Sequence, residues 1–363
     1  MADLKMLDRV SGPLPRNGRA QEAVMASYTQ VWTPLDFETD GKQYDWLRVP
    51  YSTDLSGYGV IPIPAICIRN GEGPTALLVG GSHGDEYEGQ VALAELAREI
   101  DVAQVCGRII ILPSLNTPAV EAGRRVSPLD EGNLNRSFPG SPVGGPTAMI
   151  AHYVSAILLP MADFVIDLHA GGRSTNYLPC ALIREGRNIE EKRALSDLAS
   201  AFGAPITSIS DGSGGGGATT LSAAAQALGV PVLTAELGGC ATLSRDGMAV
   251  AAQGLRRVLV GRGILVNAET HPAKPTRFMR VNGRGSFVYT MRKGLFEPAA
   301  DLGETVQAGQ LAGVIHAIDQ PWQTPESITF SEAGMVACRR ALSLTASGDC
   351  LYKLLVDDTR ESV

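Results

Sequence analysis

The stretch at 75–98 constrains the fold of this chain more than any other part of the sequence. It begins with an apolar run at 75–79, which is bounded by Gly and Pro and is short enough to be a buried strand. Gly80 and Gly81 follow, and they let the backbone turn sharply where a side chain would collide. From 90 to 98 the apolar residues recur at helical spacing. The stretch therefore predicts a strand that passes through a tight turn into a helix.

The same alternation recurs along the chain. The sequence predicts further strands at 108–113, 164–169 and 231–236, and helices at 88–100, 147–159, 187–202, 219–228 and 246–261. Strands and helices of these lengths in alternation are typical of an α/β fold with helices on both faces of the sheet. We therefore expect a mixed, largely parallel sheet flanked by helices. A long polar loop is expected at 116–146.

The two ends of the chain follow other patterns. Residues 1–55 are interpreted as an N-terminal extension, in which 36–44 forms a hairpin that turns at Asp40-Gly41. The strand-like run 60–68 contains Pro62 and Pro64, which confine it to an edge or to a strand end. From about 277, short strands and turns replace the alternation. The predicted parts are the extension at 1–55, an α/β domain at 56–272 and an all-β domain at 273–363, whose segment 295–311 resembles the half-barrel of biotinyl and lipoyl domains.

Composition and charge exclude several classes of function. Hydrophobic residues make up 44% of the chain and charged residues 19%, which is ordinary for a globular protein with material for a core. The net charge of −7 argues against nucleic acid as a partner. No apolar stretch reaches the ~18 residues of a membrane span, and 1–10 lacks the apolar core of a signal peptide. None of the six cysteines is spaced as Cys-x-x-Cys, so we expect reduced thiols in a cytoplasmic protein without a membrane partner.

Polar residues follow four of the predicted strands at the same end. His83 and Glu86 follow the first strand, Asn116 follows the second, His169 ends the third and Glu236 ends the fourth. In open α/β sheets, ligands bind at the carboxyl ends of the strands. Two imidazoles and a carboxylate suit zinc, whose catalytic sites have three protein ligands and one open position, although such ligands also accept cobalt or manganese. His83, Glu86 and His169 are therefore the candidate metal ligands.

Glu236 is the candidate general base. A carboxylate beside zinc can take a proton from the water that attacks a carbonyl and hand it to the leaving amine. The alternative interpretation is a salt-bridged carboxylate at a strand end. For the three candidate ligands, the alternative is a hydrogen-bonded turn or core residue. The predicted loop at 116–146 adds arginines, whose forked guanidinium groups bind carboxylates and can polarise an oxyanion.

Several of these segments together resemble one family. The motifs that carry the resemblance are His83-Gly-Asp-Glu86, Asn133-Leu-Asn135-Arg136, Asp167-Leu-His169 and Glu236-Leu-Gly238. They are similar to the succinylglutamate desuccinylase/aspartoacylase family, which are zinc amidohydrolases related to the zinc carboxypeptidases. The resemblance implies one Zn²⁺ per subunit, bound by His83, Glu86 and His169, with Glu236 as the catalytic base. It also implies that Arg125 polarises the scissile carbonyl, with Arg124 as the alternative, and that Asn135 and Arg136 hold a substrate carboxylate.

Finer motifs, at 36–43, 83–89, 159–164 and 294–298, are similar to the N-acetyl-2,4-diaminobutyrate deacetylases of ectoine breakdown. That similarity implies removal of an acetyl group from a small N-acyl amino acid with a second amino group. The arginine that aspartoacylases use for a second carboxylate has no clear counterpart between 169 and 236. A glycine run at 212–217 before a predicted helix start lies there instead, and we interpret it either as a lid or as an anion site.

Other functions stay open from the sequence alone. Aspartoacylase or desuccinylase activity is the first alternative. A non-catalytic protein that binds a small molecule and a carboxypeptidase acting on larger peptides are the others. We also expect a homo-oligomer, since most soluble oligomers are built from identical chains.

Overall fold

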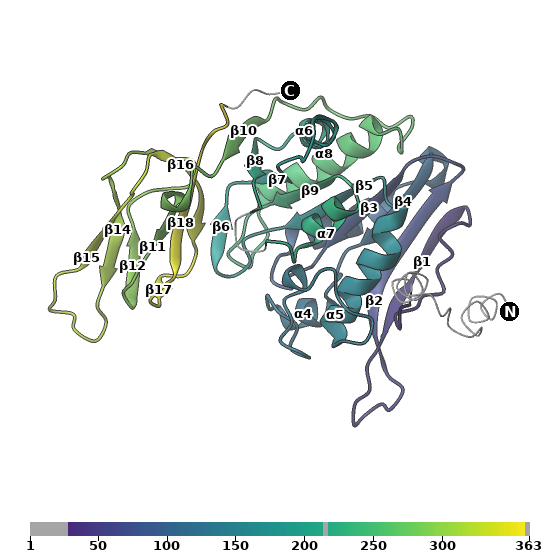
Figure 1. Cartoon of the computed structure of the whole chain (residues 1–363), viewed down its shortest axis with the longest axis horizontal. Coiled ribbons are helices and arrows are strands. Elements are labelled where there is room, and N and C mark those ends of the chain that lie inside the picture. Colours follow the sequence, from purple (N-terminus) through teal and green to yellow (C-terminus); the bar gives the residue numbers. More distant parts are fainter. Residues whose placement is uncertain (1–27, 213–216, 360–363) are drawn as a thin grey trace.

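The computed structural model describes residues 28–212 and 217–359, and its strands form a large sheet of 14 strands and a small sheet of 4 (Figure 1). The large sheet contains β1 (Gly41–Pro50), β2 (Val60–Asn70), β3 (Thr75–Gly80), β4 (Gly107–Leu112), β5 (Phe164–His169), β6 (Thr175–Tyr177), β7 (Cys180–Arg184), β8 (Ile206–Ser210), β9 (Val232–Glu236), β10 (Arg277–Arg280), β11 (Phe287–Tyr289), β13 (Thr305–Val306), β16 (Gly334–Arg340) and β18 (Cys350–Asp357). The small sheet contains β12 (Gly294–Pro298), β14 (Leu311–His316), β15 (Glu326–Thr329) and β17 (Leu344–Thr345).

The helices lie on both faces of the large sheet (Figure 1). They are α3 (Glu88–Glu99), α4 (Thr117–Ala122), α5 (Pro146–Tyr153), α6 (Ile189–Phe202), α7 (Leu221–Ala227) and α8 (Arg245–Gly261). A π turn at Val154–Leu158 and a 3₁₀ turn at Leu159–Met161 continue α5, and further 3₁₀ turns lie at Val102–Gln104, Leu134–Arg136 and Arg284–Ser286. In the part of the chain that the structure describes, no helix is long and apolar enough to cross a membrane.

Four neighbouring strands, in the order β4-β3-β5-β9, are parallel. Every residue of β3 is buried, because alternate side chains enter two cores on opposite faces. Leu78 packs with residues of α3, α6 and α8, whereas Leu77 packs with residues of α5 and α7. The predicted fold class, a mixed and largely parallel sheet flanked by helices, is therefore confirmed, as are the four predicted strands, found as β3, β4, β5 and β9.

The predicted helices are found as α3, α5, α6, α7 and α8, but the segment at 116–146 is not the uninterrupted loop that we expected. It begins with α4, which has Pro near its first turn and ends at Gly123 in the left-handed conformation. These are ordinary start and stop signals, but a helix of 6 residues is too short to show a periodic pattern. The strands β7 and β8 were also missed; β8 mixes apolar with polar residues and so lacks the mostly apolar run by which the equally short β9 was recognised.

The hairpin expected at 36–44 is wrong. Gly41 begins β1, which pairs antiparallel with β2 from Gly41↔Arg69 to Pro50↔Val60. Side-chain bonds close the turn before β1: Asp36 accepts hydrogen bonds from Glu38 N and Thr39 Oγ1, which is the usual way in which Asp makes a turn without a strand partner.

The two prolines of β2 lie in the part of the strand that has β1 alone as a neighbour. Pro62 pairs with Arg48 and Pro64 with Trp46, while pairing with β4 begins only at Ile66. The prediction that the prolines confine this run to a strand end is therefore confirmed, because neither residue is needed as a donor to a second neighbour.

The C-terminal strands continue the large sheet. β10 is parallel to β8 and antiparallel to β18, so the C-terminal strands are joined to the α/β part by strand pairing (Figure 1). The C-terminal strands of the large sheet and the small sheet enclose a separate hydrophobic core, in which Phe296 and Phe330 pack on Tyr352 of β18. The boundaries at 55/56 and 272/273 and the likeness to a half-barrel stay predictions. The first boundary falls in the loop between β1 and β2.

Candidate metal centre

The turn between β3 and α3 carries His83 and Glu86, and it packs tightly on α4. Gly84 N donates a hydrogen bond of 2.8 Å to Arg124 O, and a Cβ added at Gly84 would lie 1.9 Å from Ala119 O. Only glycine fits so close an approach between two backbones. The glycine thus holds the turn where its two functional side chains face the end of β5.

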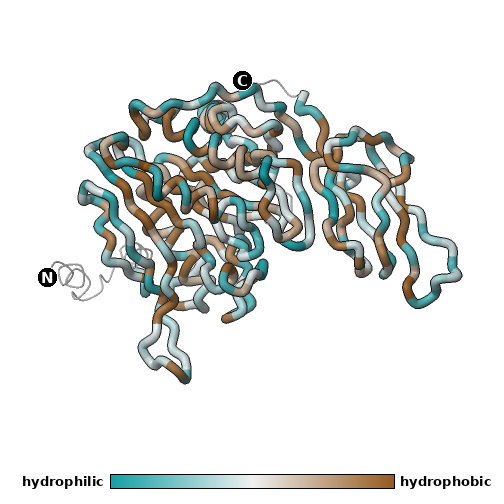
Figure 2. Tube along the Cα trace, turned by 180° about the vertical axis from the view of Figure 1, so that it is seen from behind, coloured by the Kyte–Doolittle hydropathy of each residue, from teal (hydrophilic) through white to brown (hydrophobic). Residues whose placement is uncertain are grey.

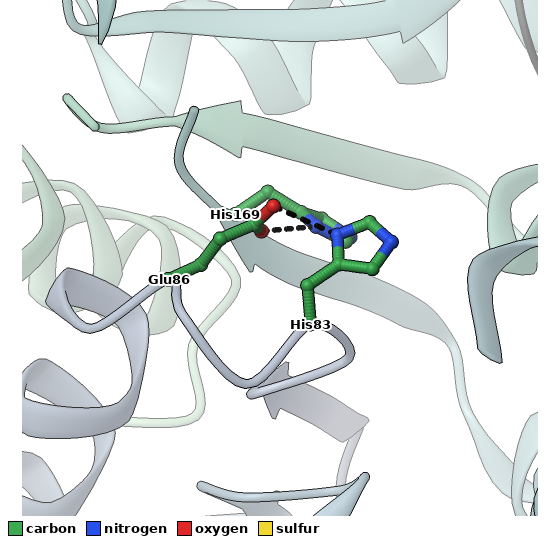
Figure 3. Close-up of side chains that lie close together, drawn as sticks. All are labelled: His83, Glu86 and His169. Carbon is green, nitrogen blue, oxygen red and sulfur yellow. Dashed lines mark hydrogen bonds and ion pairs between the residues drawn. The ribbon is translucent and has the colours of Figure 1, made fainter. Parts of the chain in front are cut away.

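Glu86 lies between the two imidazoles (Figure 3). Its Oε1 is 2.8 Å from His83 Nδ1, and its Oε2 is 2.8 Å from His169 Nδ1. Each of the three residues is only 3% exposed, and one possible ligand atom from each lies within 4.8 Å of the others. Ala170 N also donates to Glu86 Oε2, at 3.1 Å. Residues from distant parts of the chain therefore converge on one point at the carboxyl ends of β3 and β5.

The outer nitrogen of each imidazole has an oxygen partner. His83 Nε2 is 3.1 Å from Asn133 Oδ1, and His169 Nε2 is 3.0 Å from Asp167 Oδ2. Since both oxygens are acceptors, Nε2 keeps its proton in each ring, and Nδ1 is the atom left to bind a metal. Metal-binding histidines in proteins are commonly oriented by such an outer partner.

The charges at this point favour a bound cation. Burial raises the pKa of Glu86, but His83 and His169 outweigh it and hold that pKa far below its ordinary value. Burial lowers the pKa of His169, but Asp167 and Glu86 raise it well above the ordinary value. Positive charge is therefore stabilised at His169, where a metal ion would replace the proton on the ring, whereas burial lowers the pKa of His83 and keeps that ring neutral, as a metal ligand must be. Two imidazole nitrogens and one carboxylate oxygen fit a divalent ion of the zinc type and leave one position open.

Glu236 ends β9 directly beside His169, with which it is in register across the parallel pair. Its Oε2 is buried and has no hydrogen-bond partner among the described residues. Burial, and next the charge of Glu86, raise the pKa of Glu236 to about 8. A bound divalent cation would offset the charge of Glu86 and lower this pKa, leaving a carboxylate with a free oxygen next to the site.

The charge of Lys353, in the C-terminal part of the chain, also acts to lower the pKa of Glu236. Tyr177, Cys338 and Lys353 are cross-strand partners in β6, β16 and β18, so their side chains share one face of the sheet. Lys353 Nζ lies 5.8 Å from the centre of the Tyr177 ring. Its charge opposes the rise in the pKa of Glu236 more strongly than that of Arg125 does.

Of the two adjacent arginines, Arg125 is the one that reaches the ligands. Its Nη1 is 3.4 Å from Glu86 Oε1, whereas Arg124 pairs with Glu131 at 2.9 Å. The guanidinium of Arg125 is 44% exposed, so it lies at the mouth of the site. Geometry thus favours Arg125 over Arg124 as the group that can reach a bound carbonyl.

Asn135 and Arg136 lie in the 3₁₀ turn at Leu134–Arg136. The amide nitrogen of Asn135 is 3.3 Å from His169 Nε2, but both atoms carry protons in this tautomer, so they make no hydrogen bond with each other. Arg136 is exposed as a residue, but partial burial of its guanidinium, and next the charge of Arg125, lower its pKa. Two guanidinium groups that repel each other in this way provide a place for an anion.

The alternative anion site at the helix start after the glycine run is not supported by the described residues. Leu221 N donates to Asn135 Oδ1 and Ala223 N donates to Thr220 Oγ1, so these groups of α7 already have partners. Residues 213–216 lie outside the described part of the chain, and the interpretation of the run as a lid lies there with them.

Asn133, Asp167 and Lys353 had no role assigned from the sequence. Asp167 carried a usable signal, since residues two apart in a strand point to the same face and His169 ends that strand. Asn133 lies 50 positions from His83 in the chain, and Lys353 lies farther still from Glu236, so no local pattern links either pair.

A His–Glu–His cluster at the carboxyl ends of parallel strands, with the buried Oε2 of Glu236 beside it, is an arrangement that can hold a divalent metal ion next to a general base. Residues 72–262 match the sequence profile of the succinylglutamate desuccinylase/aspartoacylase catalytic domain. The chain belongs to this family, and it is an enzyme, a deacylase that hydrolyses amide bonds.

Known relatives cover nearly the whole chain. N-alpha-acetyl-L-2,4-diaminobutyric acid deacetylase of Halomonas elongata is 37% identical over 320 residues, which is 87% of this chain and 92% of that protein. The product-bound ectoine utilization protein EutE (DoeB) of Ruegeria pomeroyi is 38% identical, with a TM-score of 0.87 over 91% of this chain and 99% of that one. A succinylglutamate desuccinylase/aspartoacylase of Rhodobacter sphaeroides is 33% identical, with a TM-score of 0.86 over 91% of this chain and 100% of its own.

Proposed function

We propose that this chain is a zinc-dependent deacetylase of a small N-acyl amino acid, and that its substrate is N-acetyl-2,4-diaminobutyrate. The observation that carries the chemistry is the buried cluster of His83, Glu86 and His169 with the unpartnered oxygen of Glu236 beside it. The observation that supports the substrate is the identity of 37% to a deacetylase named for this compound, over most of both chains.

In this proposal Zn²⁺, one per subunit, is held by His83, Glu86 and His169. When bound, zinc supplies a Lewis acid that polarises the acyl carbonyl and makes water acidic enough to attack at neutral pH. Glu236 takes the proton of the attacking water on its free oxygen and passes it to the nitrogen of the leaving amine. The position of Glu236 at the end of β9, next to the ligands, suits that transfer.

The residues at the mouth of the site bind and orient the substrate. Arg125 donates hydrogen bonds to the carbonyl oxygen, where negative charge develops as water adds. Asn135 and Arg136 hold the carboxylate of the amino acid, since a guanidinium matches a carboxylate in a forked pair. Asp167 and Asn133 keep the two imidazoles in the orientation that presents Nδ1.

Two finer points belong to the same proposal. We place the enzyme in the cytoplasm, where its cysteines, all of them free thiols in the structure, would stay reduced. We also propose that the enzyme is a homo-oligomer, since most oligomers of soluble proteins consist of identical chains.

The proposal is tested with the zinc-loaded protein and a set of acylated amino acids. N-acetyl-2,4-diaminobutyrate is compared with N-acetylaspartate and N-succinylglutamate, and release of the free amine is measured. The expected result is a kcat/KM for the diaminobutyrate compound at least ~10²-fold above that for either dicarboxylate. A preference for one of the dicarboxylates would assign aspartoacylase or desuccinylase activity instead. Binding of all three without hydrolysis would support a non-catalytic protein.

A further inference from the structure

The hairpin of β1 and β2 extends beyond the rest of the chain at its loop, 51–59 (Figure 1). The side chain of Leu55 is 99% exposed there, and Tyr58 is fully exposed. Figure 2 shows one short hydrophobic stretch at the end of this projection, on a loop that is otherwise pale. An exposed leucine by itself needs no explanation, but a large contiguous apolar patch usually marks an interaction site.

The loop is held in one conformation by its own backbone. Tyr51 N donates to Gly59 O at 2.9 Å, and Thr53 and Ser56 exchange two bonds of 3.0 and 3.1 Å. Leu55 lies between the members of that second pair. The apolar side chains at the tip are thus presented by an ordered turn, which reduces the entropy that a partner would have to remove.

The same hairpin carries an apolar outer face. Tyr44 and Trp46 of β1 are about half exposed, while the alternate residues Leu47 and Val49 point into the core. On the neighbouring strand, cross-strand pairing places Pro64, Pro62 and Val60 beside this face. We call the exposed apolar set the aromatic arm; it consists of Trp32, Tyr44, Trp46, Leu55, Tyr58 and Val60.

Trp32 belongs to this face because of a contact with Arg48. The Arg48 guanidinium lies 4.5 Å from the centre of the Trp32 ring, and Arg48 also pairs with Asp45 at 3.0 Å. Tyrosine, tryptophan and arginine are the residues that most often dominate binding energy at protein interfaces. The aromatic arm has this composition.

The charges of the arm point to another copy of this chain as the partner. Over residues 42–60 the hairpin carries two charges of each sign: Asp45 pairs with Arg48, and Lys42 and Asp54 add one positive and one negative charge. The chain as a whole carries −7, so two copies repel each other unless they meet at a locally neutral surface. The aromatic arm is such a surface.

The exposed apolar area of the aromatic arm and the position of β1 at the edge of the sheet both suit association with a second copy of the chain. The exposed apolar side chains of the arm present on the order of 700 Å², close to the ~800 Å² that each partner buries in a standard-size interface. Among the residues that the structure describes, β1 is also an edge strand, with the bridge between Trp32 and Arg48 as the one pairing on its outer side. An unpaired edge accepts a second strand readily.

We infer that the aromatic arm is the surface through which two copies of this chain associate in a symmetric dimer, each arm packing against the arm or the β1 edge of the other. A two-fold axis makes one patch sufficient for both partners. The inference is independent of the substrate, because no residue of the arm belongs to the metal centre.

The test is sedimentation velocity of the full-length, zinc-loaded protein at ~1 to 50 μM. The wild-type chain is expected to sediment as a dimer. Leu55→Asp/Tyr58→Asp should weaken dimerisation by about 100-fold or more, because it places charge at the two most exposed apolar side chains of the arm. These two side chains are fully exposed in the single chain, so the substitution leaves its own packing intact.

A matched control is Trp322→Asp, which removes a tryptophan that is 81% exposed in the C-terminal part and should leave the dimer unchanged. Trp46→Glu, in the middle of the arm, serves as a second variant and should act like the tip variant. A wild-type chain that is monomeric at 50 μM would overturn the inference. Arm variants that sediment like the wild-type dimer would overturn it as well, by placing the interface elsewhere.

Discussion

At the scale of single residues, the metal centre depends on acceptors that sit behind the imidazoles. Asp167 Oδ2 is 3.0 Å from His169 Nε2, and its other oxygen is buried without a partner among the described residues. The carboxylate therefore both orients the ring and increases the negative charge around a cation. A residue that never touches the metal is expected to control how tightly the metal binds.

Asp167→Asn keeps the shape of the side chain and removes its charge. Zinc affinity is expected to fall by about 10- to 100-fold, which competition with a chromophoric chelator measures. Asp197→Asn is the matched control, because Asp197 is exposed on α6, and its zinc affinity should equal that of the wild type. Equal affinity in Asp167→Asn would remove Asp167 from the site.

Glu236→Gln separates metal binding from proton transfer. Turnover is expected to fall by roughly 10²- to 10⁴-fold, since an amide cannot accept the proton, while the zinc content stays at one per chain because Glu236 is not among the candidate ligands. Steady-state rates and metal analysis of the same sample give both values. Full activity in this variant would show that another group is the base.

Arg124 and Arg125 form a natural pair for comparison. Arg125→Ala is expected to lower kcat by about 10²- to 10³-fold, the usual cost of losing a donor to the developing oxyanion. Arg124→Ala should stay within about twofold of the wild type, because Arg124 pairs with Glu131 at the surface, where such pairs contribute little. A larger loss of kcat in Arg124→Ala than in Arg125→Ala would mean that Arg124 is the arginine that contacts the bound substrate.

At the scale of elements, the site is assembled by strand ends and by one close approach between backbones. The parallel strands β3, β5 and β9 deliver their last residues to one edge of the sheet. The turn after β3 then reaches the others only because Gly84 lets it lie against α4. The candidate metal ligands and the candidate base therefore lie at the ends of strands and in the turns that follow them, and not in the middle of strands or helices.

Gly84→Ala is expected to shift this turn, because the added methyl would lie 1.9 Å from Ala119 O. We expect a lower melting temperature and weaker zinc binding together, read by calorimetry and metal analysis. Gly261→Ala, at the end of α8 with no atom within 4 Å of the added carbon, is the control. It should be neutral or stabilising by up to ~1 kcal/mol. If Gly84→Ala has the melting temperature and zinc affinity of the wild type, α4 can move away from the added methyl group at little cost in stability.

At the scale of the whole molecule, the proposed zinc ion would join parts that are far apart in the chain. His83 and His169 come from different βα connections, so the ion would act as a link that only the folded state can form. Removing zinc with a chelator is expected to lower the melting temperature by roughly 5–10 °C, given ligand at ~1,000 times its Kd. Scanning calorimetry of the stripped and reloaded protein tests this, and identical melting temperatures would argue against a metal at this point.

The amino-acid sequence by itself determined the central strands, the helices that cover them and the candidates for the metal centre. Each of these rests on local physics: apolar runs of strand length, helical spacing of apolar residues, and polar residues placed directly after a buried strand. The motif from His83 to Glu86 is readable because both ligands lie within one turn. The helix α4 was missed because its 6 residues are too few to show a helical period, and the strand β8 was missed because its residues do not form a continuous apolar run.

Only the tertiary structure decided how distant residues meet. It brought His169 to Glu86, chose Arg125 over Arg124 as the arginine near the ligands, and placed Asn133 behind His83. It also joined the C-terminal strands to the large sheet, so that the charge of Lys353 acts on Glu236. The hairpin expected at 36–44 was wrong because strand register depends on the partner strand, here β2, more than on a local turn signal. Contacts of this kind depend on loop paths and pairing across the whole chain, for which no local pattern exists.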